Sequence, residues 1–134
     1  MTRFCLDTSA YSHFKRGHAV VVEALDSAEW VGVPAVTIGE LWAGFLQGTR
    51  VADNGAELEE FLENPVVELL PVDDQVGRIY AEIVVELKRK GTPLPTNDIW
   101  IAATAARAGA TVLTYDPHFN QIVRVGCLVL QPPE

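Results

Sequence analysis

Apolar positions along this chain follow two different spacings. Short runs rich in β-forming residues alternate with longer segments in which apolar residues recur every three or four positions. The short runs predict strands at residues 2–6, 30–33, 66–72, 111–115 and 127–130. The helical spacing predicts helices at residues 11–16, 18–28, 37–47, 54–63, 73–90 and 97–108. This alternation predicts an α/β fold, in which helices flank both faces of a mostly parallel sheet.

Capping and turn residues place the ends of these elements. Asp7-Thr8-Ser9 follows the first strand and offers side chains that cap a helix. Asp73-Asp74 begins the longest helix, and Gly91 ends it after a basic run. Two prolines between residues 92 and 96 predict a loop, and Asp116-Pro117 predicts a turn.

The composition fits one domain that covers residues 1–134. The 134 residues are 49% hydrophobic and 21% charged, which excludes a disordered acidic tail. Cys5 and Cys127 lie in apolar runs, so we interpret them as two buried thiols in a reducing compartment. No apolar stretch approaches the roughly 20 residues of a membrane-spanning helix, and no signal-peptide pattern opens the sequence. We therefore expect a soluble, cytoplasmic protein.

Four acidic residues occupy positions that point to chemistry. Asp7 and Asp116 come directly after predicted strands, and sites in parallel sheets lie beyond the carboxyl ends of the strands. Asp98 begins an alanine-rich helix, and Glu40 lies opposite the apolar stripe of helix 37–47. Each acid also has an ordinary explanation, as a helix cap, a turn residue or a solvated glutamate.

Convergence of these four carboxylates would require a cation. Like charges a few ångströms apart raise one another's pKa values, and a divalent cation removes the repulsion. An all-oxygen site suits Mg²⁺ or Mn²⁺. A zinc site is not favoured, because His13, His18 and His118 are scattered along the sequence. Acidic sites that hold Mg²⁺ typically carry out phosphoryl chemistry with a metal-activated water.

The motifs around these acids resemble those of the PIN-domain ribonucleases, and more narrowly of the VapC-type toxins of bacterial toxin–antitoxin pairs. The resemblance covers essentially the whole chain. It rests on four stretches: Leu6-Asp7-Thr8-Ser9, Glu40 in a helix, Asn97-Asp98-Ile99-Trp100-Ile101-Ala102-Ala103, and Leu113-Thr114-Tyr115-Asp116 followed by His118-Phe119. It implies a PIN-like α/β/α sandwich and endonucleolytic cleavage of RNA that depends on Mg²⁺ or Mn²⁺. It also implies a homodimer that a cognate VapB-type antitoxin neutralises in a hetero-oligomer.

The resemblance also assigns roles by position. The metal-binding, catalytic acids would be Asp7, Glu40, Asp98 and Asp116. Their neighbours Thr8, Ser9, Asn97 and Thr114 would orient carboxylates or water. Tyr115 and Trp100 are bulkier than is usual for the family at these positions, which affects the expected RNA contacts but not the acids. Candidate RNA-binding cations are Lys15, Arg16, Lys88, Arg89 and Lys90.

Three other interpretations can be weighed on the same residues. A phospho-acceptor receiver domain needs a late lysine, and no lysine follows Lys90. A HAD-type phosphatase needs a second aspartate two residues after the first, where this chain has Ser9. A degenerate, non-catalytic PIN domain that serves as a protein- or RNA-binding module stays open, although the presence of all four acids disfavours it.

The net charge of −8 argues at first against a nucleic-acid substrate. The charge arises from 18 acidic and 10 basic residues, and four of the acids belong to the predicted metal site. Two divalent cations would cancel the nominal charge of that site. We therefore expect RNA binding to depend on metal, and we expect the metal-free protein to bind RNA poorly.

Overall fold

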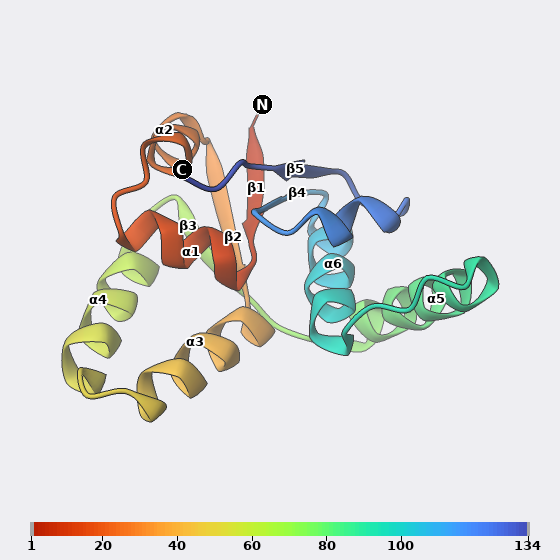
Figure 1. The fold of residues 1–134 in the computed structure, drawn as a ribbon, viewed down its shortest axis with the longest axis horizontal. Helices are drawn as coiled ribbons and strands as arrows, with labels where there is room; N and C mark the ends of the chain where they lie inside the picture. The colour runs from red at the N-terminus through yellow and green to blue at the C-terminus, as the bar shows by residue number, and fades with distance from the viewer. Residues whose placement is uncertain (1, 134) are drawn as a thin grey trace.

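A computed structural model describes residues 2–133. Within these residues, five parallel strands form one sheet in the order β3-β2-β1-β4-β5 (Figure 1). The strands are β1 (Arg3–Leu6), β2 (Trp30–Pro34), β3 (Val67–Leu70), β4 (Thr111–Thr114) and β5 (Cys127–Val129). The helices are α1 (Thr8–Lys15), α2 (Ala19–Ser27), α3 (Ala35–Gln47), α4 (Val51–Glu63), α5 (Asp74–Lys90), α6 (Thr96–Ala108) and the 3-10 helix η1 (Pro117–Gln121). The structure confirms the predicted parallel α/β fold.

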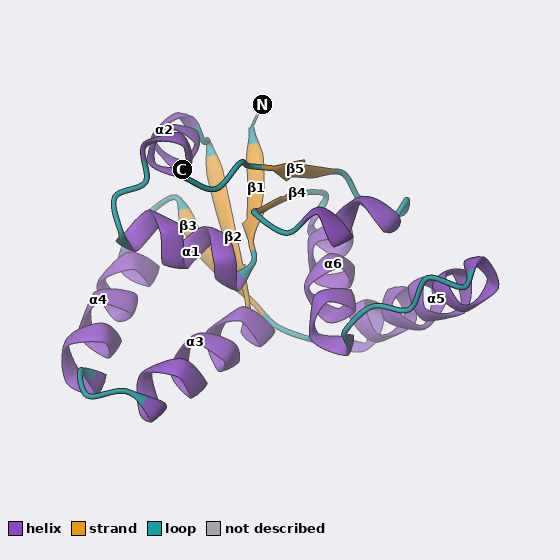
Figure 2. Cartoon of the chain, viewed as in Figure 1, coloured by secondary structure: helices purple, strands orange, loops and turns teal. Residues whose placement is uncertain are grey.

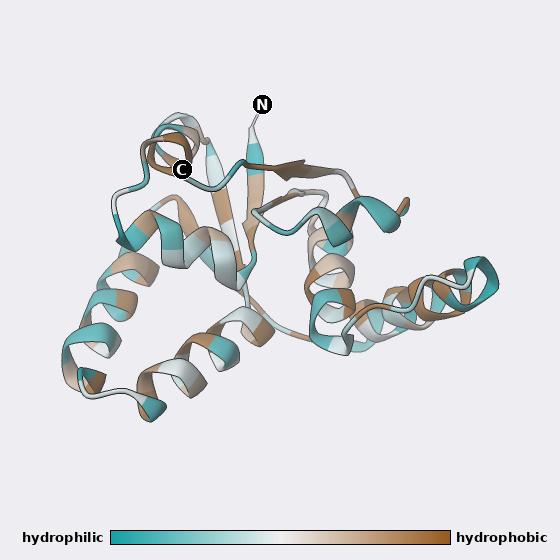
Figure 3. Cartoon of the chain, viewed as in Figure 1, coloured by the Kyte–Doolittle hydropathy of each residue, from teal (hydrophilic) through white to brown (hydrophobic). Residues whose placement is uncertain are grey.

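Helices cover both faces of the sheet (Figure 2). Phe4 and Leu6 of β1 join a core with residues of α1–α4, whereas Cys5 between them joins a second core built mainly from α5, α6 and η1. This alternation follows from the two-residue repeat of a strand. The helices carry hydrophobic and hydrophilic stretches along one ribbon, as expected of elements with one buried side (Figure 3).

The order of the strands determines where the residues that follow β1 and β4 lie. β1 pairs with β2 on one side and with β4 on the other, and Leu6 is in register with Leu113. The chain adds strands first in one direction from β1 and then in the other, so β1 and β4 flank a topological switch point. Residues that directly follow these two strands therefore lie beside each other at one edge of the sheet.

Several boundaries differ from the sequence-based expectation. β4 ends at Thr114, so Tyr115 lies outside the strand in which we expected it. The expected turn at Asp116-Pro117 is the start of η1, because the Asp116 side chain accepts a hydrogen bond from the His118 N–H. Cys5 is buried as predicted, but Cys127 is half-buried, and its thiol contacts Asn120 Oδ1 at 3.0 Å. None of the helices described between residues 2 and 133 is long and apolar enough to cross a membrane.

Candidate active site at the carboxyl ends of β1 and β4

Asp7 is the most deeply buried of the four acids, with 5% of its surface exposed. It is the N-cap of α1, and its Oδ1 accepts a hydrogen bond of 2.9 Å from the Ala10 N–H. The Ser9 hydroxyl donates to the same carboxylate at 2.8 Å, and the Thr114 hydroxyl donates to Oδ2. Burial raises the pKa of Asp7, whereas these hydrogen bonds lower it and the charge of Asp116 raises it. The hydroxyl groups thus favour the ionised carboxylate in a site that penalises charge.

The same two hydroxyl groups connect β1 to the segment after β4. Ser9 Oγ accepts a hydrogen bond of 3.0 Å from the Tyr115 N–H. Thr114 Oγ1 accepts one of 2.9 Å from the Asp116 N–H. Each hydroxyl therefore donates to Asp7 and accepts from the backbone beside Asp116. The predicted roles of Ser9 and Thr114 as carboxylate-orienting residues are consistent with this geometry.

Asp116 lies at the start of η1 and is about one-third exposed. Its Oδ1 accepts the 2.9 Å hydrogen bond from the His118 N–H, and His118 Nδ1 lies 2.9 Å from the same oxygen. The backbone contact fixes the carboxylate at the end of the 3-10 helix where partial positive charge gathers.

Glu40 reaches the site from α3. The buried Thr37, one turn earlier, donates a 2.9 Å hydrogen bond to the Leu6 carbonyl and so fixes the start of α3 against the end of β1. The Thr8 hydroxyl donates to Glu40 Oε1 at 2.6 Å, and the Asn97 amide donates to Oε2 at 3.3 Å. These two contacts join α3 to α1 and α6 through a single carboxylate.

Asp98 lies in the first turn of α6, and its carboxyl is half-buried. Ile101, Ala102 and Ala105, which follow Asp98 at helical spacing, are buried. The pKa of Asp98 is raised to about 6, first by burial and then by the negative charges of Asp116, Glu40 and Asp7, while His118 lowers it. The other three acids therefore act electrostatically on the carboxyl group of Asp98.

The donor set suits a hard divalent cation, although the carboxylates do not form a closed metal cage. No three carboxylate, imidazole or thiolate groups among residues 2–133 are close enough to hold one ion together. Hydroxyl, amide and imidazole groups hold the acids individually. The donors are nonetheless oxygens, and mutual repulsion raises the pKa of Asp98. Mg²⁺ or Mn²⁺ fits these properties, since both prefer oxygen ligands and would relieve the repulsion.

Among residues 2–133, none of the candidate RNA-binding cations forms an ion pair with any of the four acids. Lys15 pairs with Glu57 at 3.4 Å, and Arg16 follows α1 at its C-terminal end. Both line a groove of about 430 Å³ between α1, α3 and α4. Lys90 donates to the Gln121 carbonyl at 3.0 Å. Lys88 lines a pocket of about 260 Å³ together with Thr96 and Ile99 of the first turn of α6.

A cluster of three aromatic rings adjoins Asp116 and was not expected from the sequence. The rings of His13 and Tyr115 are stacked, with centroids 3.9 Å apart, and His18 Nδ1 lies 2.6 Å from the Tyr115 hydroxyl. Their separation in the sequence follows no helical or strand period, so no pattern pointed to this cluster. The unusual Tyr115 beside Asp116 was the only available signal.

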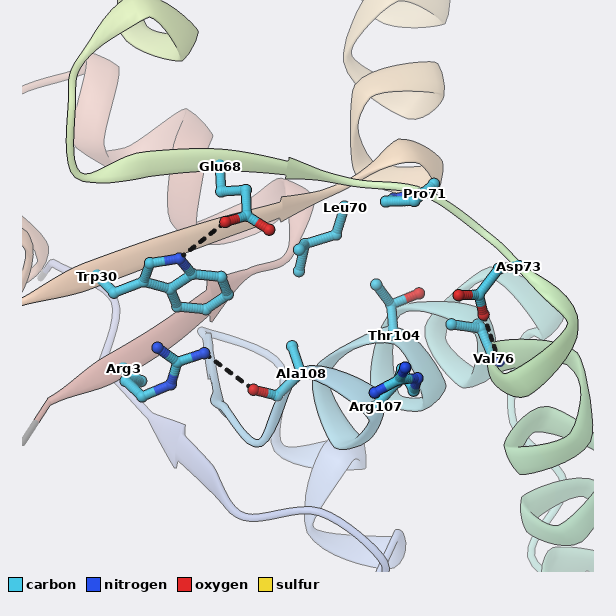
Figure 4. A pocket seen from close by; sticks show the side chains of 10 residues that line it. All are labelled: Arg3, Trp30, Glu68, Leu70, Pro71, Asp73, Val76, Thr104, Arg107 and Ala108. Carbon is cyan, nitrogen blue, oxygen red and sulfur yellow. Dashed lines mark hydrogen bonds between the residues drawn. The ribbon is translucent and has the colours of Figure 1, made fainter.

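A cavity of about 420 Å³ lies elsewhere, against β2, β3 and α6 (Figure 4). The Arg3 guanidinium lies 4.1 Å from the centre of the Trp30 ring and donates to the Ala108 carbonyl. None of the four acids lines this cavity, so it is separate from the acidic site.

The sequence matches the PIN domain family over residues 4–125. It is 32% identical to Ribonuclease VapC5 of Mycobacterium tuberculosis over 117 residues, which cover 85% of this chain and 83% of that protein. DNA-bound VapBC from Salmonella typhimurium contains a chain that is 28% identical and superposes with a TM-score of 0.82, covering 96% of this chain and 98% of that one. VapBC2 from Rickettsia felis, 20% identical, shares the fold with a TM-score of 0.85 over 97% of this chain and 100% of its own.

The match over residues 4–125 and the parallel sheet with acids at its switch point define the class, and the chain belongs to the PIN-domain family. Identity of 32% over most of both chains places it more narrowly among the VapC-type ribonuclease toxins of toxin–antitoxin systems.

Proposed function

We propose that this chain is an endoribonuclease that depends on Mg²⁺ or Mn²⁺ and acts as the toxin of a toxin–antitoxin pair. The observation that carries the proposal is the electrostatic coupling of four carboxylates at one edge of the sheet. The negative charges of Asp116, Glu40 and Asp7 all raise the pKa of Asp98. Such repulsion is costly in a metal-free protein and becomes useful when the carboxylates share a cation.

The residues of this chain would prepare the site for hydrolysis of a phosphodiester. Asp7, Glu40, Asp98 and Asp116 would hold the metal, which when bound would activate water and stabilise charge on the phosphate. The hydrogen bonds from Ser9 and Thr114 favour the ionised form of Asp7, whose pKa is raised by burial. Thr8 and Asn97 orient Glu40. Attack in line with the leaving oxygen would break the bond to the 3′ oxygen and leave a 5′-phosphate and a 3′-hydroxyl.

The proposed partners are RNA as substrate and a VapB-type antitoxin as inhibitor. The similar proteins of Salmonella typhimurium and Rickettsia felis are described as VapBC, with DNA bound. We propose that this chain likewise combines with a cognate antitoxin in a hetero-oligomer and forms a homodimer. The target RNA would be selected by its shape and by a few loop contacts.

The test is cleavage of end-labelled RNA by the purified chain. We expect cleavage with Mg²⁺ or Mn²⁺, none with EDTA, and recovery when metal is added in excess of the chelator. Asp98→Asn should lower the rate at least about 100-fold, because charge stabilisation at such sites contributes several kcal/mol. Glu59→Gln removes the same charge from an exposed position of α4 and is expected to cleave normally.

Two outcomes would contradict the proposal. Cleavage that persists in EDTA would show that no metal is needed. Cleavage by the Asp7→Asn/Asp98→Asn double variant would show that the acids are not the active site. Metal-dependent RNA binding without any cleavage would instead favour a non-catalytic binding module.

A further inference from the structure

Tyr115 is held by three independent contacts between the two parts of the acidic site. Its backbone N–H donates to Ser9 Oγ at 3.0 Å. Its ring is stacked on His13, with centroids 3.9 Å apart and the planes 18° from parallel. Its hydroxyl lies 2.6 Å from His18 Nδ1. The residues on either side of it are Thr114, which donates to Asp7, and Asp116, which is one of the four acids.

The two histidines are themselves fixed by the backbone around them. His13 Nδ1 lies 2.9 Å from the Ser9 carbonyl, which can only accept, so Nδ1 carries the proton and donates. His18 is the N-cap of α2, yet its side chain makes no capping hydrogen bond and contacts Tyr115 instead. Gly17 between them adopts a positive φ of 77°, which allows the chain to turn and brings the two imidazole rings to 5.6 Å.

This arrangement opposes the repulsion between the carboxylates of Asp7 and Asp116. Asp7 and Asp116 carry like charges, and the charge of Asp116 raises the pKa of Asp7. Asp7 cannot move away easily, because it caps α1 and is buried. Asp116 lies on a short irregular segment between β4 and η1 and is partly exposed. The hydrogen bonds to Ser9 and Thr114 restrain the backbone of this segment, and the side chain of Tyr115 adds a further restraint.

We propose that His13 and His18 clamp Tyr115 and thereby keep Asp116 beside Asp7, where a bound cation could draw the acids together. His13, His18 and Tyr115 are positioning residues in this proposal, because they act through Asp116. The inference rests on the proposed function, since it assigns a role in assembling the proposed metal site. In the metal-free protein, the clamp opposes the repulsion between the carboxylates, and a bound cation would take over this role.

Two single variants test the clamp. Tyr115→Phe removes only the hydroxyl and keeps the stacked ring, and His18→Ala removes the other partner of the same contact. We expect each variant to need about tenfold more Mn²⁺ for half-maximal cleavage, as is common when residues that orient metal ligands are changed. Saturating Mn²⁺ should restore kcat, and KM for RNA should not change. Tyr80→Phe, whose ring is stacked on Trp100 away from the acids, is the matched control and should need no additional Mn²⁺.

The double variant His18→Ala/Tyr115→Phe should be no worse than the poorer single variant, because both changes break one contact. Additive losses would show that the two residues act separately. A loss of kcat that saturating Mn²⁺ does not restore would also overturn the proposal, since it would indicate general damage to the site.

A second measurement does not depend on cleavage. In the metal-free protein, amide hydrogen exchange at Asp116 and His118 should be about tenfold faster in Tyr115→Phe than in the wild type, because their hydrogen bonds form on the released segment. Unchanged exchange at both amides would overturn the clamp. If the wild type neither binds Mn²⁺ in calorimetry nor cleaves RNA, the proposed function fails, and the exchange rates still decide whether the clamp exists.

Discussion

The Thr114 hydroxyl donates a hydrogen bond to the carboxylate of Asp7, although the two residues are 107 positions apart in the chain. The bond crosses from the end of β4 to the end of β1, and the same hydroxyl accepts the Asp116 N–H at 2.9 Å. One buried side chain thus orients two of the four acids. This hydrogen bond favours the ionised form of Asp7, whereas burial favours its protonated form.

Thr114→Val should therefore affect both stability and the pH dependence of cleavage. The variant keeps the shape of the side chain but removes one of the hydrogen-bond donors of Asp7 and leaves the Asp116 N–H without its partner, which costs about 1–3 kcal/mol of unfolding free energy. Because the lost hydrogen bond lowered the pKa of Asp7, that pKa should rise and the acidic limb of the activity profile should move to higher pH. Urea unfolding and rates across pH measure the two effects. Thr104→Val, which removes a hydroxyl bonded only to the Trp100 carbonyl within α6, should leave the activity profile unchanged.

Stability of the metal-free protein should depend on the protonation of Asp98. The folded-state pKa is raised from 3.8 to about 6, so the folded protein binds more protons than the unfolded chain between these values. The ionised Asp98 carboxylate therefore lowers the free energy of unfolding above pH 6. This destabilisation disappears as the pH falls from about 6 to 4. After solvent screening of a half-exposed group, we expect Asp98→Asn to be about 1 kcal/mol more stable than the wild type at pH 7.

Urea unfolding in the presence of EDTA at several pH values measures this difference. The comparison between wild type and Asp98→Asn isolates one carboxyl, because every other titrating group is shared. An advantage of the variant that stays constant from pH 7 to pH 4 would contradict the assignment of the raised pKa to Asp98.

Mg²⁺ or Mn²⁺ should stabilise the folded wild type at pH 7. A ligand at 100 times its Kd that binds only the folded state adds about 2.7 kcal/mol to the unfolding free energy. The Asp7→Asn/Asp98→Asn variant should gain much less, since two of its four candidate ligands have lost their charge. Thermal unfolding with and without metal tests this, and an equal gain in both proteins would place the cation elsewhere.

Asn97→Ala should weaken metal binding while leaving the fold intact. Asn97 is exposed, and its amide donates to Glu40 Oε2 at 3.3 Å, so its loss frees one oxygen of Glu40 to rotate. Changes of this kind typically reduce metal affinity by about 10- to 100-fold. Calorimetric titration with Mn²⁺ measures the affinity, and Asn120→Ala, in η1 beside Cys127, is the control with the same side chain removed. Equal Mn²⁺ affinities in the two variants would show that Asn97 does not contribute to the metal site.

Gly55→Ala should destabilise the packing of α3 on α4. A Cβ at Gly55 would lie 2.5 Å from the Trp42 ring, so the indole or the helix must shift, at a cost of about 1–3 kcal/mol. Gly77→Ala in α5 meets nothing within 4 Å and should stabilise the protein by about 0.5–1 kcal/mol. Urea unfolding of the two variants should therefore give changes of opposite sign, and a stabilising Gly55→Ala would contradict the described contact.

The sequence by itself determined the order of the elements and the parallel α/β fold, and it singled out four candidate acids. Strand and helix periods are local, as are the caps at Asp7 and Asp73 and the left-handed glycines Gly91 and Gly109, so a single chain reveals them. Asp7 and Asp116 could be singled out in the sequence because each directly follows a predicted strand.

Only the tertiary structure decided which side chains contact those acids and the residues beside them. The contacts of Thr114 with Asp7, Asn97 with Glu40, and His18 with Tyr115 join residues 107, 57 and 97 positions apart. No local period encodes such distances, since strand order and helix docking set them. For the same reason, no local pattern predicted that Lys90, at the basic end of α5, donates to the Gln121 carbonyl 31 positions along the chain.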